Sequence, residues 1–263
     1  MQPAANLGTN VAPDHNPAIM HRFANPARFQ RIANAVLPWF AAATALLLAA
    51  GLYFALFDSP ADYQQGETVR IMYIHVPAAW MALFIYSFIA AASAAALIWR
   101  HPLADVAARA ASPVGACFTF LALASGSLWG KPMWGAWWVW DARLTSVLIL
   151  FFLYLGHMAL LRAFDDPTRG ARSAAILALA GFVNVPIIKF SVDWWNTLHQ
   201  PASIIRMGGP SIDPSMLLPL LLMAIGFTTF FVVVLLLRMK TDLLAARLRA
   251  AQFARLQPAT AAR

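Results

Sequence analysis

Six long apolar runs, in which charged side chains are almost absent, constrain this 263-residue chain more than any other feature. A helix needs roughly 20 apolar residues to cross the hydrocarbon core of a bilayer. We place the runs at 36–57, 71–98, 112–129, 144–161, 173–190 and 214–237. The fifth run is the weakest, because Pro186 and Lys189 near its end predict a kink or an early exit. The sequence therefore predicts an all-α polytopic membrane protein, a bundle of six transmembrane helices.

The distribution of positive charge predicts the orientation of this bundle. Charged residues make up only 11% of the chain, whereas soluble domains carry about 25%. With both termini cytoplasmic, 14 of the 19 Lys and Arg residues fall on the inner side, as the positive-inside rule requires. We therefore expect cytoplasmic termini, and we attribute the net charge of +8 to membrane topology and not to nucleic-acid binding.

The chain is expected to have three parts: a cytoplasmic N-terminal tail (1–35), a six-helix membrane domain (36–237) and a basic cytoplasmic C-terminal tail (238–263). The first 35 residues are polar and show no cleavable signal peptide, so the first run is expected to act as an uncleaved anchor. In residues 241–256, leucines and arginines recur at helical spacing. This pattern predicts a basic helix on the anionic inner leaflet.

Five of the ten tryptophans lie between the third and fourth runs, at Trp129, Trp134, Trp137, Trp138 and Trp140. A helix is anchored at the membrane surface by one or two such rings. Five rings interspersed with glycines instead predict an aromatic platform for a large, flat, apolar ligand. The topology places this platform at the outer face.

Two of the six histidines are expected at the same depth as the platform. His75 lies about one turn into the second run, and His199 lies in the outer segment before the sixth. Imidazole is a good axial ligand for haem iron, so the pair and the tryptophans predict a haem site. Interfacial histidines and tryptophans also occur as anchors, and the residue types alone leave both interpretations open. For His157, deep in the fourth run, we favour a structural role.

Haem propionates need cations, and few lie on the outer side: Arg70, Lys131, Arg143, Lys189 and Arg206. Arginine pairs with carboxylates in a bidentate way, although Arg143 and Lys189 also fit snorkelling anchors at helix ends. Asp141 directly precedes the fourth run, where Asp is a strong helix N-cap. Phosphate-binding loops and metal-ligand patterns of Cys and His are absent from the sequence, and outer carboxylates are not paired with a nucleophile. A self-contained hydrolase is therefore not expected.

Residues 134–141, Trp-Gly-Ala-Trp-Trp-Val-Trp-Asp, resemble the tryptophan-rich WWD signature of haem-handling membrane proteins. The continuation Ala142-Arg-Leu-Thr resembles one branch closely, the haem exporter protein C (CcmC) family of bacterial cytochrome c maturation. The resemblance continues at 61–66, 75–79, 130–133, 164–167 and 194–200, and it covers roughly residues 30–240.

The resemblance implies a specific site and specific partners. Haem b would be held at the periplasmic face of the bacterial inner membrane, with His75 and His199 as axial ligands of the iron. The family's tryptophan motif, matched here by Trp134, Trp137, Trp138, Trp140 and Asp141, would lie against the porphyrin. Together with this motif we predict Trp129 as a haem-binding residue, and from the short list of outer cations we predict Arg70, Lys131, Arg143 and Arg206 as partners of the propionates. Such proteins load haem onto the periplasmic haem chaperone CcmE within a complex containing the ABC transporter CcmA/CcmB and CcmD. Because this sequence has no ATP-binding motif, it is expected not to be an enzyme, and ATP hydrolysis would belong to a partner.

Two alternatives remain at this stage. A cytochrome c synthase of the same superfamily, a haem lyase, would attach haem to an apocytochrome, but such chains typically carry more spans or a large soluble region. An electron-transfer subunit with a bis-histidine haem and a quinone usually places its ligands deep within helices. Here both candidate ligands are expected at the outer edge.

Overall fold

The computed structural model describes residues 25–200, 204 and 207–256. The helices in these ranges are α2 (Pro26–Tyr53), α3 (Met72–Trp99), α4 (Pro102–Trp134), α5 (Ala142–Leu160), α6 (Pro167–Gly181), α7 (Asn184–Trp194) and α8 (Pro214–Leu256). A π-helical turn (Phe54–Asp58) and a 3-10 helix (Glu67–Ile71) lie between α2 and α3. Six segments of the described chain are long and apolar enough to cross a membrane. The predicted all-helical fold with six spans is confirmed.

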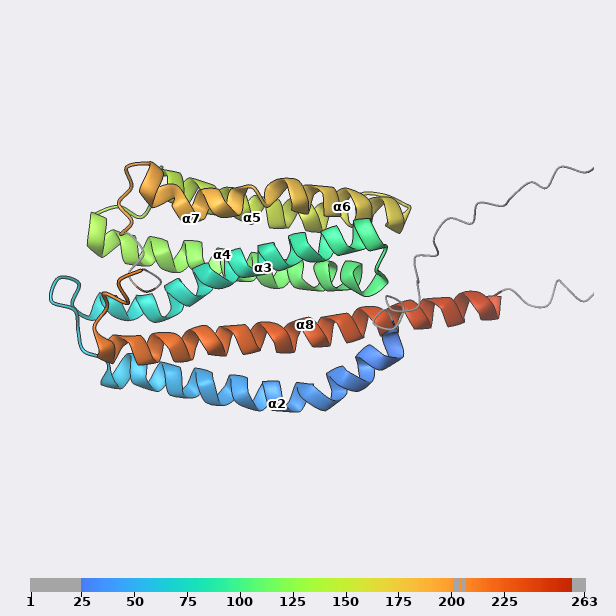
Figure 1. Ribbon diagram of the computed structural model, residues 1–263, viewed down its shortest axis with the longest axis horizontal. Helices are drawn as coiled ribbons and strands as arrows, with labels where there is room; N and C mark the ends of the chain where they lie inside the picture. The colour runs from blue at the N-terminus through green and yellow to red at the C-terminus, as the bar shows by residue number, and fades with distance from the viewer. Residues whose placement is uncertain (1–24, 201–203, 205–206, 257–263) are drawn as a thin grey trace, which may run out of the picture.

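The helices form an elongated bundle (Figure 1). The long helix α8 packs against α2 along one side, α3 and α4 pair in the middle, and α5, α6 and α7 lie on the other side. The beginning of α2 and the end of α8 lie at one end of the bundle. The segments that follow α2, α4 and α7 lie at the opposite end.

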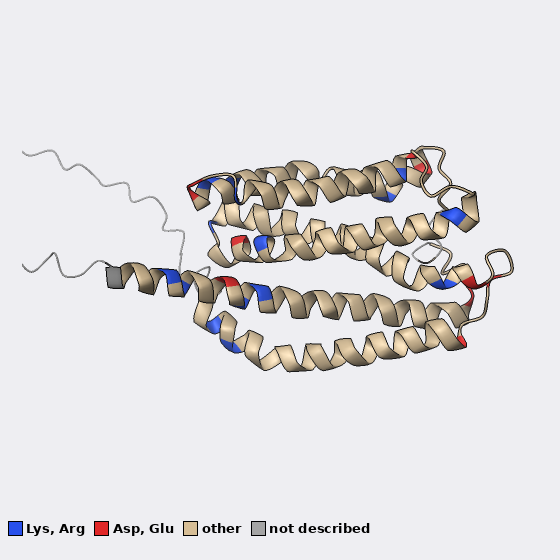
Figure 2. Cartoon of the chain, turned by 180° about the vertical axis from the view of Figure 1, so that it is seen from behind, with Lys and Arg blue, Asp and Glu red and all other residues tan. Residues whose placement is uncertain are grey.

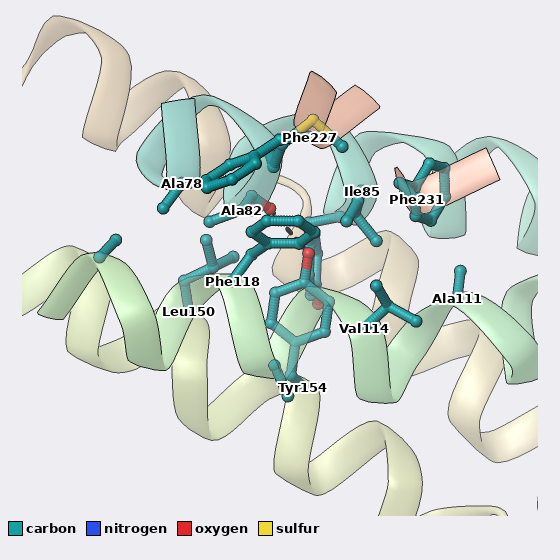
Figure 3. Packing of buried hydrophobic residues seen from close by; sticks show 14 of the residues in the cluster. Ala78, Ala82, Ile85, Ala111, Val114, Phe118, Leu150, Tyr154, Phe227 and Phe231 are labelled. Atoms are coloured by element: carbon teal, nitrogen blue, oxygen red, sulfur yellow. Dashed lines mark hydrogen bonds between the residues drawn. The ribbon is translucent and has the colours of Figure 1, made fainter. Parts of the chain in front are cut away.

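Tyr154 of α5 is a centre of the buried core (Figure 3). Its hydroxyl donates a 2.7 Å hydrogen bond to the carbonyl of Ala82 in α3, and its ring packs edge-to-face on Tyr86 at 5.1 Å. Gly115 of α4 leaves the space that the Tyr154 ring occupies, because a side chain there would overlap it. Small residues at such positions let membrane helices approach closely, and here they join α3, α4 and α5 into one core.

The fifth span is broken into two helices, α6 and α7. The break falls at residues 182–183, one turn before Pro186, because the proline nitrogen has no hydrogen to donate to the carbonyl of Phe182. Below the break, the carbonyl of Leu177 in α6 accepts a hydrogen bond from Tyr86 of α3. Above it, Asn184 donates a 2.8 Å hydrogen bond to the carbonyl of Ser146 in α5. The predicted kink is present, and α7 extends beyond the predicted end of the run at 190, to Trp194.

Several helices continue beyond the apolar runs that predict them. Helix α2 begins at Pro26, within the expected tail, and Asn25 caps it by accepting the N–H of Ala27 at 2.9 Å. Helix α8 continues without interruption to Leu256. The basic segment 241–256 therefore prolongs the last span and does not form a separate surface helix. Arg247 in this extension donates to Gln30 of α2 at 3.1 Å.

Candidate functional site

A cavity of about 410 Å³ lies between α3, α4, α5 and α7, at the end of the bundle that carries the tryptophan segment. Its size falls within the range of about 300–1,000 Å³ that is usual for small-molecule pockets. His75 from the first turn of α3 and His199 from the segment after α7 both line it. The fold thus brings the two predicted ligands, from distant parts of the sequence, to one cavity.

His75 is held by the neighbouring helix α4. Its Nδ1 lies 3.0 Å from the carbonyl oxygen of Ala122 and 3.2 Å from the hydroxyl of Ser125. A carbonyl only accepts hydrogen bonds, so Nδ1 carries the proton and Nε2 keeps its lone pair. Gly126 makes this position possible, because a Cβ there would lie 2.8 Å from Cε1 of His75. The imidazole is therefore fixed in the tautomer that coordinates a metal through Nε2.

His199 is held by Asp141 and Thr197. Its Nδ1 lies 3.4 Å from Oδ2 of Asp141, and the Thr197 hydroxyl donates a hydrogen bond to the same carboxylate oxygen. The backbone N–H of His199 donates in turn to the Thr197 hydroxyl at 3.1 Å. The ring of Trp134 packs against the imidazole at 5.0 Å. This network, like that around His75, leaves Nε2 available.

Asp141 has two functions in this structure. Its Oδ1 accepts the backbone N–H of Leu144 at 2.7 Å, which confirms the predicted N-cap of α5. Its Oδ2 binds Thr197 and His199. Asp141 is not among the described residues that line the cavity, and its carboxylate lies behind His199, which does line it.

The two partners shift each other's pKa. Burial raises the pKa of Asp141. The hydrogen bonds from Thr197 and Leu144 and the adjacent His199 together lower this pKa by more than burial raises it, so that the net shift is downward. Burial, the largest cause, lowers the pKa of His199, Asp141 raises it and Arg143 lowers it, so that the net shift is downward. His199 is therefore neutral at pH 7, which is the state required of a metal ligand.

The tryptophan segment is only partly a loop, and only part of it lines the cavity. Helix α4 continues through Pro132 to Trp134, where Gly135 ends it with a positive φ of 74°. The rings of this segment that line the cavity are Trp129, Trp134 and Trp138, and Trp80 of α3 is a further lining ring. Trp137 and Trp140 are 55% and 75% exposed and are not among the described lining residues. The predicted platform of five rings is in this structure a wall of three rings with two more at the surface.

Most of the predicted propionate-binding cations are engaged elsewhere. Arg70 forms a 2.6 Å ion pair with Glu67 and donates to the carbonyl of Ala55. Lys131 donates to the carbonyl of Gly135 at 2.9 Å. Neither Arg70 nor Lys131 is among the described residues that line the cavity. Arg206 lies outside the described residues.

Arg143 and Lys189 do line the cavity, together with Asp193. Arg143 joins α5 to α7, because its Nε donates to the Ser191 hydroxyl at 3.1 Å and one terminal nitrogen donates to the carbonyls of Ile188 and Lys189. Arg143 thus makes structural contacts and also lines the cavity, so its predicted contact with a propionate stays a prediction.

Sequence reasoning missed several residues around the histidines: Gln65, Ala122, Ser125, Gly126 and Thr197. Gln65 accepts a 2.9 Å hydrogen bond from the Trp129 indole. The turn that presents Gln65 is built by Asp62, whose carboxylate accepts the N–H groups of Gln64 and Gln65. An Asp at a turn is a readable signal, as is the small-residue run 124–127 at a helix contact. Ala122 contributes only a carbonyl, for which the sequence carries no signal.

Comparisons with known proteins show the family to which the chain belongs. A family model described as "Heme exporter protein C" matches residues 19–254. The chain belongs to the haem exporter protein C (CcmC) family. The matched range contains all the lining residues discussed above, including both histidines.

Individual members of the CcmC family are similar over most of their length. Heme exporter protein C of Bradyrhizobium diazoefficiens is 63% identical over 229 residues, which cover 87% of each chain. Its counterpart in Escherichia coli K12 is 48% identical over 225 residues, 86% of this chain and 91% of that protein. A ccmC-like mitochondrial protein of Marchantia polymorpha, named for cytochrome c biosynthesis, is 50% identical over 185 residues, 70% of this chain and 77% of that protein.

Proposed function

We propose that this chain binds haem b between His75 and His199 and delivers it to the periplasmic haem chaperone CcmE during cytochrome c maturation. The names of its relatives support a role in haem export, and one of them names cytochrome c biosynthesis. The observation that carries the proposal is the convergence of two histidines on one cavity, each with Nδ1 held by an oxygen atom. Held in this way, both rings would have Nε2 free to ligate the haem iron.

The walls of the cavity suit the rest of the porphyrin. Trp129, Trp134 and Trp138 provide aromatic faces, and the deeper lining is apolar, with Val76, Ala79, Leu83, Val147 and Leu150. Tryptophan rings can make stacked or edge-to-face contacts with a flat aromatic ring system such as a porphyrin. The exposed ring of Trp140 packs edge-to-face on the lining residue Trp138 at 5.5 Å, and Trp137, next to Trp138 in the chain, is also exposed. We assign them to the surface on which the chaperone docks.

The charge distribution supports a periplasmic site. Lys and Arg are found at the ends of α2, α6 and α8 that lie away from the cavity (Figure 2). Under the positive-inside rule this end is cytoplasmic and the cavity end is periplasmic in the bacterial inner membrane. The sequence has no phosphate-binding loop, so ATP hydrolysis is assigned to partners, the ABC transporter CcmA/CcmB with CcmD.

The proposal is tested by purifying the wild type, His75→Ala and His199→Ala after co-expression with CcmE. His157→Ala is the matched control, because His157 is a buried histidine that is not among the described lining residues. We expect low-spin haem in the wild type and in the control. In the two other variants the haem is lost or becomes high-spin, and CcmE stays unloaded. Unchanged haem spectra in both would contradict the proposed ligands.

The same preparations separate the two alternative functions. A haem lyase would leave haem covalently attached to a co-expressed apocytochrome in the absence of other maturation proteins. An electron-transfer subunit would hold its haem stably and be reduced by quinol. We expect neither result, because the proposed role requires haem to leave the cavity for CcmE.

A further inference from the structure

The cavity is enclosed unevenly by the four helices that form it. Around it, α3 packs against α4, α4 against α5 and α5 against α7, whereas α3 and α7 barely touch in the part of the chain that the structure describes. Both of these helices nevertheless contribute lining residues, which are Val76, Trp80 and Leu83 from α3 and Ile188 and Val192 from α7. The wall of the cavity is therefore least packed along the line between α3 and α7, which we call the α3–α7 seam.

The break in the fifth span accounts for this seam, because the two halves of the span are bonded to different neighbours. Below the break, Tyr86 of α3 donates to the carbonyl of Leu177 and holds α6 against α3. Above the break, hydrogen bonds of Asn184 and Arg143 hold α7 against α5 instead. Helix α3 also runs obliquely, from the side of α8 at its beginning to the side of α6 at its end (Figure 1). The two helices therefore diverge toward the end of the bundle that carries the cavity.

The depth of the seam places it beside lipid chains and not beside water. Trp80 follows Met72, the first residue of α3, by eight positions, which is about 12 Å along a helix that rises about 1.5 Å per residue. Half of the hydrocarbon core of a bilayer is about 15 Å thick. Trp80 is half-buried, and Phe84, one turn further along α3, is 49% exposed. The seam thus faces the acyl chains in the half of the membrane that carries the cavity.

Among the described residues, the other ends of the cavity are covered. Ala82 and Leu150 line its inner end and are buried. Directly below them, the buried Tyr154 joins α5 to α3 through its hydrogen bond to the Ala82 carbonyl. At the outer end, the chain that runs from α7 to α8 contributes Gln200 and Ile204 to the lining. The core therefore separates the cavity from the opposite end of the bundle, and the α3–α7 seam is its side facing lipid.

We propose that the ligand enters the cavity sideways from the lipid, through the α3–α7 seam, with Trp80 at the edge of the passage. The inference rests on the proposed function, under which the ligand is haem. A flat, largely apolar molecule collects in the bilayer, because moving apolar surface out of water is favourable. Entry through the seam keeps that surface away from water until the ligand reaches the cavity.

The test measures how fast the apoprotein in lipid nanodiscs takes up haem from phosphatidylcholine vesicles. Cys117→Ser removes the single native cysteine, and Trp80→Cys or Ile149→Cys is added and labelled with a bulky, lipid-soluble maleimide. Ile149 is the matched control, because it lies seven positions after the first residue of α5, is 47% exposed and is not among the described lining residues. Trp80→Ala, which widens the passage, is the converse variant.

We expect the label at Trp80→Cys to slow haem uptake by at least about tenfold relative to the same variant without label, because a modest rise in a barrier already changes a rate tenfold. The label at Ile149→Cys leaves the rate unchanged, and Trp80→Ala takes up haem at least as fast as the wild type. All variants reach the same low-spin spectrum, since a passage determines the rate and not the equilibrium. Label added to Trp80→Cys after loading leaves the haem in place.

Three results would overturn the inference and leave the proposed function intact. One is an unchanged rate in labelled Trp80→Cys, or an equal slowing in labelled Ile149→Cys. Another is slower uptake in Trp80→Ala. The third is loss of haem when the loaded Trp80→Cys variant is labelled, which would place Trp80 within the binding space and not at its entrance. A wild type that takes up no haem would instead contradict the proposed function itself, and the inference with it.

Discussion

Nδ1 of His199 lies 3.4 Å from Oδ2 of Asp141, the last residue of the tryptophan signature. The two residues come from segments on either side of three helices, α5, α6 and α7. The same carboxylate caps α5 through Leu144 and accepts the Thr197 hydroxyl. One side chain thus fixes both the start of a helix and the orientation of a candidate iron ligand.

Asp141→Asn separates these two roles. Asparagine caps a helix about as well as aspartate, so the thermal stability of the apoprotein is expected to change little. Loss of the carboxylate behind a ligating histidine typically costs 10–100-fold in metal affinity, and we expect haem affinity to fall by at least about tenfold. Asp141→Ala should in addition lose about 1 kcal/mol of stability. Haem titration and thermal unfolding measure the two effects, and equal haem affinity in Asp141→Asn and wild type would contradict the positioning role.

Gly126→Ala displaces His75 without altering the histidine itself. The added Cβ would lie 2.8 Å from Cε1 of the ring and 3.3 Å from Nδ1. We expect the bound haem to become partly high-spin and the affinity to fall by about tenfold, as for other disturbed metal ligands. Gly208→Ala is the control, because nothing lies within 4 Å of its added Cβ. Low-spin haem of wild-type affinity in Gly126→Ala would show that α4 does not hold His75 in this way.

Haem binding is expected to persist below the ordinary pKa of histidine. Burial, only partly offset by Asp141, lowers the pKa of His199 from 6.5. The neutral ring is therefore favoured in the folded state. As pH falls from 6.5 toward the folded pKa, the unfolded chain takes up a proton that the native chain does not, and stability decreases.

This pH dependence is measured on the apoprotein by following the His199 ring signals by NMR between pH 8 and 4. We expect a midpoint below 6.5 in the wild type and a still lower one in Asp141→Asn, because the carboxylate raises the pKa. A midpoint above 6.5 in the wild type would contradict the assignment of burial as the dominant cause.

Tyr154→Phe tests the hydrogen bond that joins α5 to α3 at Ala82, a residue that also lines the cavity. The variant removes the hydrogen bond from the hydroxyl to the Ala82 carbonyl and keeps the edge-to-face contact with Tyr86. Interhelical hydrogen bonds in membranes are worth about 0.6 kcal/mol on average and up to about 1.7. We expect a loss of stability of that size in thermal unfolding, with the haem spectrum unchanged. A larger loss together with altered haem would contradict this expectation and show that the bond also shapes the cavity wall at Ala82.

The sequence predicted the fold well because lipid imposes a strong constraint on each span. The predicted topology placed His75 and His199 at the same end of the bundle. In the structure both line one cavity at that end. The helix ends were predicted less well, because an apolar run marks contact with lipid and not the limits of backbone hydrogen bonding. Helix α4, for example, continues past the predicted end of its apolar run at 129, through Pro132, and carries Trp134 on its last turn.

Side-chain roles depended on contacts that the sequence does not encode locally. Which tryptophans face the cavity is decided by the turn at Gly135, after which Trp137 and Trp140 point outward. Arg70 was predicted to bind a propionate from its place shortly before His75, but in the structure its side chain contacts Glu67 and the carbonyl of Ala55. The network that joins Asp141 to His199 arises only when α7 packs against α5.

The central claim, that His75 and His199 would both ligate the iron of one haem, is tested most directly by ligand rescue. His75→Gly and His199→Gly are loaded with haem, and their absorption spectra are recorded before and after addition of imidazole. We expect each variant to hold high-spin or weakly bound haem that imidazole returns to the low-spin spectrum of the wild type. A low-spin spectrum in either variant without imidazole would contradict the claim, because the iron would then take its ligand from elsewhere.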